Sequence, residues 1–257
     1  ICENGAVLAE SERFTTGLIM TELDLGRIAH ERRRMNTFGQ AGRAMTDIWF
    51  DLPVREVKLT RAFPQTPFVP ADRTDLAARC EEILHLQATG LATRLRHTRA
   101  KAAVIGLSGG LDSTLALIVT VHAFDMLGWP RSGIQAVTMP CFGTTRRTKS
   151  NAEQLAEAYG ATLQCVDIKA AVTQHFADIG HDPDKLDVTY ENAQARQRTY
   201  ILMDIANQMG GLVIGTGDLS ELALGWATYN GDHMSMYGVN CSVPKTLVRH
   251  LVRYAAE

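Results

Sequence analysis

The sequence predicts an α/β fold in which a parallel sheet carries helices on both faces. Three observations indicate this fold. Short apolar runs alternate with longer runs of helical periodicity from Ala103 to Leu224. Glycines follow the helical runs, as at Gly128, Gly160 and Gly210. Polar, glycine-containing stretches follow the apolar runs, which is where ligands bind in parallel sheets.

The composition narrows the function. The chain has 257 residues, is 46% hydrophobic and carries a net charge of −2. This charge gives no attraction to nucleic acid or to an anionic membrane, so we predict neither partner. No segment approaches the ~18 apolar residues of a spanning helix. Five cysteines without a C-x-x-C motif predict a reducing, cytoplasmic setting.

The first 60 residues read as short strands and one helix. Ala6–Leu8 is a brief apolar run, and Ile19–Leu25 and Val54–Leu59 alternate as strands do. Gly26–Asn36 is charged and predicted to be helical. Strands with so few partners indicate the edge of a larger sheet. Prolines recur at every third position from Pro64 to Pro70, so we predict a stiff linker over residues 61–73.

The second domain is expected over residues 74–257. It begins with a helix, Asp75–His97, whose N-cap would be Thr74. The expected strands are Ala103–Leu107, Ile134–Met139, Thr162–Val166 and Leu212–Ile214. The expected helices between and after them are Asp112–Leu127, Arg147–Tyr159, Lys169–Ile179, Thr189–Met209 and Asp218–Leu224.

The turn from Gly106 to Ser113 is the most informative stretch. Glycines at the start of a helix let backbone N–H groups approach an anion. A Walker A loop is excluded because no lysine follows the glycines. Gly106, Ser108 and Gly110 match the G-x-S-x-G nucleophile elbow, so a serine hydrolase remains an alternative. Ser108 to Ser113 reads S-G-G-x-D-S and resembles the pyrophosphate loop of ATP pyrophosphatases, which we favour.

A second glycine turn, Gly215 to Glu221, follows the last predicted strand. Glu221 falls in the first turn of a helix and would face Asp112 across the sheet end. Two carboxylates and phosphate oxygens suit Mg²⁺. The alternative is that Glu221 only complements the helix dipole. Tyr229–Val239 is expected to be a mobile loop that closes over a substrate, with a contribution from Asp232.

Several motifs in a fixed order identify a family resemblance. They are T-G-D-L-S-E-L-A-L-G-W from Thr216, E-N-x-Q-A-R from Glu191, M-P-x-F-G-T from Met139, and V-P-K-T-L from Val243. From about residue 100 onward the chain resembles the synthetase domain of glutamine-dependent NAD synthetases. The resemblance implies an adenine-nucleotide α-hydrolase-like, Rossmann-like sheet. Residues 1–60 resemble the end of the nitrilase-like glutaminase domain in that family, without its catalytic residues. The chain also stops soon after Lys245, so we expect the synthetase domain to be incomplete.

The resemblance implies an activity. ATP and Mg²⁺ would activate the nicotinate carboxylate of deamido-NAD as an acyl-adenylate, and ammonia would convert it to NAD. In full-length members glutamine supplies the ammonia, and we expect a homo-oligomer. The implied ATP contacts are Gly106, Ser108, Gly109, Gly110, Asp112, Ser113, Met139, Thr216 and Lys245. The implied deamido-NAD contacts are Asn192, Glu221, Trp226, Ala227, Thr228 and Tyr229. Asp112 and Glu221 would bind the metal, and Asp112 and Lys245 would be catalytic.

Three alternatives stay open at this point. A serine hydrolase would need one of His175, His181, His233 or His250 beside Ser108. A tRNA-thiolating pyrophosphatase would need paired cysteines and a basic surface, and the sequence shows neither. A non-catalytic fragment would bind ATP without turnover.

Overall fold

The computed structural model describes residues 1–37, 46, 48–51, 53, 55, 56, 58, 60–142 and 146–257. The chain forms two compact units, Ile1–Gln65 and Thr66–Glu257. Within the described residues, no helix combines the length and the apolar character that crossing a bilayer requires.

The first unit is small. It contains the antiparallel strands β1 (Cys2–Glu3) and β2 (Ala6–Val7) and the helix α1 (Leu25–Arg34). The expected strand Ile19–Leu25 is wrong, because residues 19–24 have no regular structure and Leu25 starts α1. Side chains hold this stretch instead: Asp24 caps α1, and the Glu22 carboxylate accepts from the backbone N–H groups of Thr60 and Arg61. Of the expected strand Val54–Leu59, residues 55, 56 and 58 have no regular structure, and residues 54, 57 and 59 lie outside the described residues. The nitrilase-like origin of this unit stays a prediction.

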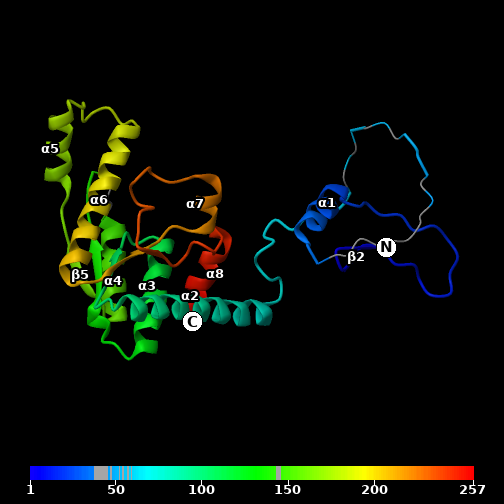
Figure 1. Ribbon diagram of the computed structural model, residues 1–257, viewed down its shortest axis with the longest axis horizontal. Coiled ribbons are helices and arrows are strands. Elements are labelled where there is room, and N and C mark those ends of the chain that lie inside the picture. Colours follow the sequence, from blue (N-terminus) through cyan, green and yellow to red (C-terminus); the bar gives the residue numbers. More distant parts are fainter. Residues whose placement is uncertain are drawn as a thin grey trace. The chain divides into compact units, whose positions relative to one another are not determined.

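The second unit is a parallel sheet covered by helices (Figure 1). Its strands are β3 (Ala103–Gly106), β4 (Ile134–Thr138), β5 (Thr162–Cys165), β6 (Leu212–Gly215) and β7 (Tyr237–Gly238). They lie in the order β5-β4-β3-β6-β7, and every pairing is parallel. Its helices are α2 (Arg73–Thr98), α3 (Leu111–Leu127), the 3-10 helix η1 (Arg131–Gly133), α4 (Arg146–Tyr159), α5 (Lys169–Ile179), α6 (Val188–Met209), α7 (Leu219–Leu224) and α8 (Lys245–Ala256).

The central strands β3, β4 and β6 are buried on both faces, which confirms the predicted fold class. Side chains of one strand alternate between the two faces. Ala103 and Ile105 of β3 belong to the core cluster formed with α2, α3 and α8, whereas Val104 belongs to the cluster formed with α5 and α6. Strands buried on both faces read as continuous apolar runs, and this explains why they stand out in the sequence.

The N-cap of α2 differs from the predicted one, and α3 is more buried than an amphipathic helix. Asp72, not Thr74, is the N-cap of α2, because its carboxylate accepts from the N–H groups of Thr74 and Asp75. The helix therefore starts at Arg73. The helix α3 is buried along almost its whole length, since it is packed between the sheet, α2 and α8.

The sequence analysis did not predict β7 and α8. The strand β7 has two residues, too few for a periodic pattern, and it lies inside the segment expected to be a loop. It pairs with β6 through Ile214 and Gly215. The helix α8 begins directly after Pro244 and buries Leu247, Val248 and Leu251 against α3 and α2. Its first residue, Lys245, is thereby brought to the carboxyl end of the sheet.

Candidate functional site

The first strand-to-helix turn folds as an anion-binding loop. It connects β3 to α3, and Gly110 is the extended residue at the helix N-cap. The Ser108 hydroxyl lies 3.1 Å from the Ser113 hydroxyl and accepts from the Gly110 N–H at 3.3 Å. Gly109 has φ +79°, a conformation that residues with a side chain rarely adopt. The free N–H groups at the start of α3 therefore face the loop, as a bound phosphate requires.

The same geometry argues against a nucleophile elbow. In an elbow the serine sits on a strained turn beside a histidine. Among the described residues other than glycine, φ is positive at Asn4, Phe14, Arg99 and Asn230, and Ser108 is not one of them. The hydrogen bonds of Ser108 in the described part of the chain go to Ser113 and Gly110, and none goes to a histidine. A hydroxyl held this way is arranged to contact an anion, not to attack a carbonyl group.

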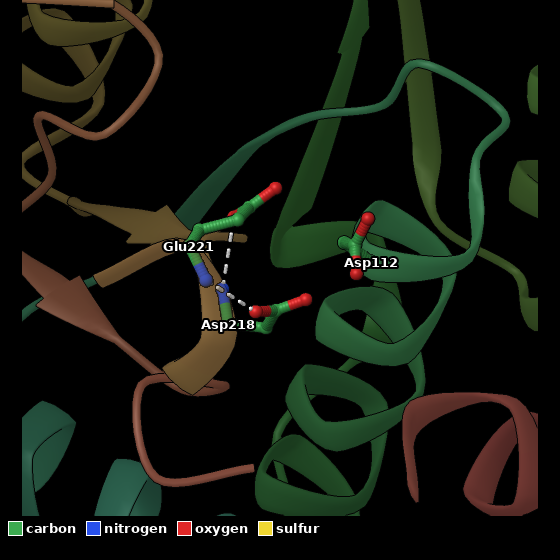
Figure 2. A group of neighbouring side chains, drawn as sticks. All are labelled: Asp112, Asp218 and Glu221. Carbon is green, nitrogen blue, oxygen red and sulfur yellow. Dashed lines mark hydrogen bonds between the residues drawn. The ribbon is translucent and has the colours of Figure 1, made fainter. Parts of the chain in front are cut away.

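Three carboxylates meet beside this loop (Figure 2). Asp112 projects from the first turn of α3, and Asp218 and Glu221 come from the start of α7. One oxygen of each carboxylate lies within 4.8 Å of the others. Asp218 and Glu221 form a capping box: Asp218 accepts from the Glu221 N–H at 2.9 Å, and Glu221 accepts from the Asp218 N–H at 3.0 Å. Glu221 therefore both caps its helix and presents a second oxygen to the cluster.

Lys245 neutralises part of this negative charge. Its ammonium group lies 2.5 Å from Asp112 Oδ2 and 3.3 Å from Asp218 Oδ2. Burial lowers the pKa of Lys245, but the hydrogen bonds and charges of Asp112 and Asp218 outweigh burial and raise it overall. The backbone N–H of Lys245 also donates to the Ser220 hydroxyl at 3.0 Å, which fixes the start of α8 against α7. The lysine is thus a permanent cation at the cluster.

The cluster fits a hard divalent cation. Asp112 Oδ1 is buried and has no hydrogen-bond partner among the described residues, and the buried Asp218 Oδ2 has only its ion pair with Lys245 at 3.3 Å there. Buried carboxylate oxygens without a donor are costly, and a cation repays that cost. The donor set is oxygen only, which Mg²⁺ prefers over softer ligands. The residues present therefore fit a magnesium site, and the fit includes Asp218, a carboxylate that was not predicted from the sequence as a ligand.

The loop and the cluster open into a cavity of about 860 Å³. The structure brings most of the predicted site residues to its wall: Gly106, Ser108, Asp112, Ser113, Met139, Asn192, Thr216, Glu221, Trp226, Ala227, Thr228 and Tyr229. Gly109 and Gly110 belong to the same loop, and Lys245 reaches Asp112 from α8. Gly143 and Thr144 of the M-P-x-F-G-T motif lie outside the described residues.

One wall of the cavity is held by α6. Arg198 pairs with Asp232 through two hydrogen bonds of 3.0 and 2.8 Å, and Arg196 Nε donates to the Tyr229 carbonyl at 3.1 Å. Trp226 and Tyr229 are 79% and 71% exposed, so their rings are not used to pack the chain. The backbone of this segment is fixed while its aromatic rings stay accessible.

Two residues of the site, Asp218 and Arg198, were not assigned from the sequence alone. Asp218 was counted as part of a helix, although an aspartate before L-S-E is the signature of a capping box. Arg198 lies one helical turn beyond Gln194 in the E-N-x-Q-A-R segment, and only the structure joins it to Asp232. Asp232, which was expected to contribute from a loop, lines the cavity, and its carboxylate is ion-paired with Arg198.

The fold and the site together define a class. A parallel sheet whose first strand is followed by an S-G-G-x-D-S loop at the start of a helix matches the class expected from the sequence, the ATP pyrophosphatases. The NAD synthase family model matches residues 83–256. The chain belongs to the NAD synthase family. The family predicted from the motifs is confirmed.

Similar proteins and similar solved structures agree with this family assignment. The glutamine-dependent NAD(+) synthetases of Mycobacterium tuberculosis and Mycobacterium leprae are 47% and 48% identical to this chain over 270 aligned residues, covering 99% of it. The chain spans 40% of the length of each of these relatives. The glutamine-dependent NAD+ synthetase of Acinetobacter baumannii, solved in complex with adenosine diphosphate, is 31% identical with a TM-score of 0.64. That match covers 72% of this chain and 34% of the other.

The NMN synthetase of Francisella tularensis has the same fold. It is 26% identical with a TM-score of 0.62, and the match covers 69% of this chain and 71% of that chain.

Two neighbouring glycines of the loop should respond differently to alanine. Gly109→Ala places a Cβ at φ +79°, which costs about 1–2 kcal/mol of the free energy of unfolding. Gly110→Ala keeps a φ of −90°, and its Cβ would touch only Ser108 Oγ at 3.4 Å, so we expect a change within ~0.5 kcal/mol. Urea unfolding of both variants measures the difference. Equal losses would mean that Gly109 is not the strained position.

Proposed function

We propose that this chain is the synthetase part of an enzyme that uses ATP to amidate deamido-NAD. A nicotinate carboxylate oxygen attacks the α-phosphorus of ATP, and pyrophosphate leaves with the bonding electrons. Ammonia then attacks the acyl carbon, AMP leaves, and the nitrogen loses a proton to give the amide of NAD. One observation carries the proposal: the Ser108–Ser113 loop and the charged cluster of Asp112, Asp218, Glu221 and Lys245 meet at one cavity.

The first step brings together groups of the same charge. A carboxylate has to approach a triphosphate, so the site must offset phosphate charge before the chemistry begins. The N–H groups at the start of α3, the hydroxyls of Ser108 and Ser113, and the Lys245 ammonium are placed to do this. None of these groups needs to form a covalent bond. Ser108 therefore binds phosphate in this proposal.

Asp112, Asp218 and Glu221 would hold the magnesium. When bound, Mg²⁺ supplies positive charge to the phosphate oxygens and so makes the α-phosphorus easier to attack. Lys245, which pairs with two of the same carboxylates, orients them and adds a cation for the leaving pyrophosphate. The buried Asp112 Oδ1, which has no hydrogen-bond partner among the described residues, supports this role.

Deamido-NAD would occupy the other end of the cavity. Asn192 offers an amide for its polar groups, and the exposed rings of Trp226 and Tyr229 offer flat surfaces for stacking on an aromatic ring. The ion pair between Arg198 and Asp232 holds this segment in place. Ammonia from glutamine, a homo-oligomeric assembly and a cytoplasmic location complete the proposal; the names of the relatives support the use of glutamine.

An isotope experiment tests the proposed reaction. Deamido-NAD labelled with ¹⁸O in the nicotinate carboxylate is incubated with this chain, Mg²⁺-ATP and ammonium chloride. If the carboxylate attacks the α-phosphorus, one labelled oxygen remains on the AMP phosphate. Mass spectrometry of AMP, pyrophosphate and phosphate reads the result. Label in inorganic phosphate with ADP as product would contradict an acyl-adenylate, and ATP binding without AMP would favour a non-catalytic fragment.

The two loop serines separate a ligase from a hydrolase. A hydrogen bond to a charged group contributes about 1.5–3 kcal/mol, so Ser108→Ala and Ser113→Ala should each lower kcat/KM about 10- to 200-fold. The losses should be similar, because both hydroxyls would contact the same anion. Steady-state release of pyrophosphate measures them. A complete loss in Ser108→Ala alone, together with an acylated Ser108, would establish the nucleophile elbow instead.

A further inference from the structure

Asn240 is a buried polar residue that the proposed reaction does not use. It lies between β7 and α8, and its exposed fraction is 0%. Its side-chain amide donates to the Asp112 carbonyl at 3.0 Å and to the Thr216 carbonyl at 3.1 Å. One amide nitrogen therefore joins the backbones of the two turns that carry the carboxylate cluster.

The orientation of this amide is fixed from the other side. Gln87 of α2 donates to Asn240 Oδ1 at 3.2 Å and to the Val239 carbonyl at 2.7 Å. Because Gln87 requires an acceptor there, the Asn240 amide must turn its two N–H groups toward Asp112 and Thr216. The hydrogen-bonded side chains of Gln87 and Asn240 thus connect the core helix α2 with both turns.

The sheet alone does not set the spacing of these turns. The strands β3 and β6 pair with each other as far as Ile105 and Ile214, and beyond these residues no pairing joins the two. Asp112 lies seven residues beyond Ile105, and Asp218 lies four residues beyond Ile214. The hydrogen bonds of Asn240 span this gap behind the carboxylates. Loss of those bonds would remove the link that the buried Asn240 amide makes between the Asp112 and Thr216 carbonyl groups.

We propose that Asn240 is a positioning residue that holds Asp112 and the Asp218–Glu221 turn at the spacing at which they share one cation. The inference rests on the proposed function, since it concerns the same Mg²⁺-ATP site. Asn240 itself contacts neither ATP nor the metal. Replacement of Asn240 should therefore reduce the part of the ATP affinity that depends on magnesium. It should not change the contacts between the loop and ATP that need no metal.

Two variants and one control test the proposal. Asn240→Asp keeps the shape but turns a carboxylate oxygen toward two carbonyl oxygens, so both bonds are replaced by repulsion. Asn240→Ser is too short to reach either carbonyl and serves as the second variant if Asn240→Asp does not fold. Thr120→Val is the matched control, because Thr120 is also 0% exposed, lies in α3 and bonds only locally, to the Ala116 carbonyl.

The measurement is the Kd of ATP by titration calorimetry, with excess Mg²⁺ and with EDTA. In the unmodified chain Mg²⁺ should tighten ATP binding. Small displacements of a positioned group cost up to ~100-fold, so in Asn240→Asp or Asn240→Ser this gain should fall about 10-fold or more, with the metal-free Kd within about 3-fold of the unmodified chain. Thr120→Val should keep the full gain even where its Tm falls.

The outcomes separate this proposal from the function on which it rests. If Mg²⁺ tightens ATP binding equally in the unmodified chain and in the Asn240 variants, Asn240 does not position the cluster. If the variants lose metal-free and metal-dependent affinity together, with a fall in Tm, the role is structural and the proposal is also overturned. If Mg²⁺ does not tighten ATP binding in the unmodified chain, the proposed function fails first.

Discussion

The main physical constraint on the structure is the repulsion among three carboxylates, whose oxygens lie within 4.8 Å of one another at the end of the sheet. The rest of the site has to offset that repulsion. Asp218 is wholly buried, and like charges this close are unfavourable unless cations lie among them. Lys245 provides one such cation, and it reaches the cluster because α8 packs behind α3. The buried Asp112 Oδ1, which has no hydrogen-bond partner among the described residues, marks the place of a second cation. Without the packing of α2, α3 and α8, these charged side chains would move apart. The packing therefore keeps the carboxylates and Lys245 close together.

Much of the fold could be predicted from the sequence, because strands buried on both faces produce unbroken apolar runs such as Ala103–Ile105. Glycines at the ends of helices gave the boundaries of α3 and α6. The prediction was wrong for Ile19–Leu25, where alternation exists but the carboxylates of Glu22 and Asp24 hold the backbone instead of a neighbouring strand. Alternation of apolar and polar residues is compatible with a strand, but it gives no information on whether a partner strand is present.

The candidate site was predicted where local motifs carry it. Ser108, Asp112 and Glu221 stand in recognisable turns, and the structure brings these turns to one cavity. Asp218, Asn240 and the Arg198–Asp232 pair could not be found in this way, because their roles come from contacts between residues 24 to 128 positions apart or from a cap whose side chain serves two purposes. Their chemistry appears only when the fold places them.

The most direct measurement of the central claim is the binding of Mn²⁺, used in place of Mg²⁺, followed by electron paramagnetic resonance in the presence of a non-hydrolysable ATP analogue. If Asp112, Asp218 and Glu221 together hold the cation, Asp218→Asn should weaken Mn²⁺ binding by at least about tenfold while the ATP analogue alone still binds. Asp218→Asn retains a side-chain oxygen for the cap of α7, so the fold around Glu221 should persist. Unchanged Mn²⁺ binding in this variant would contradict the claim that the buried carboxylates form the metal site.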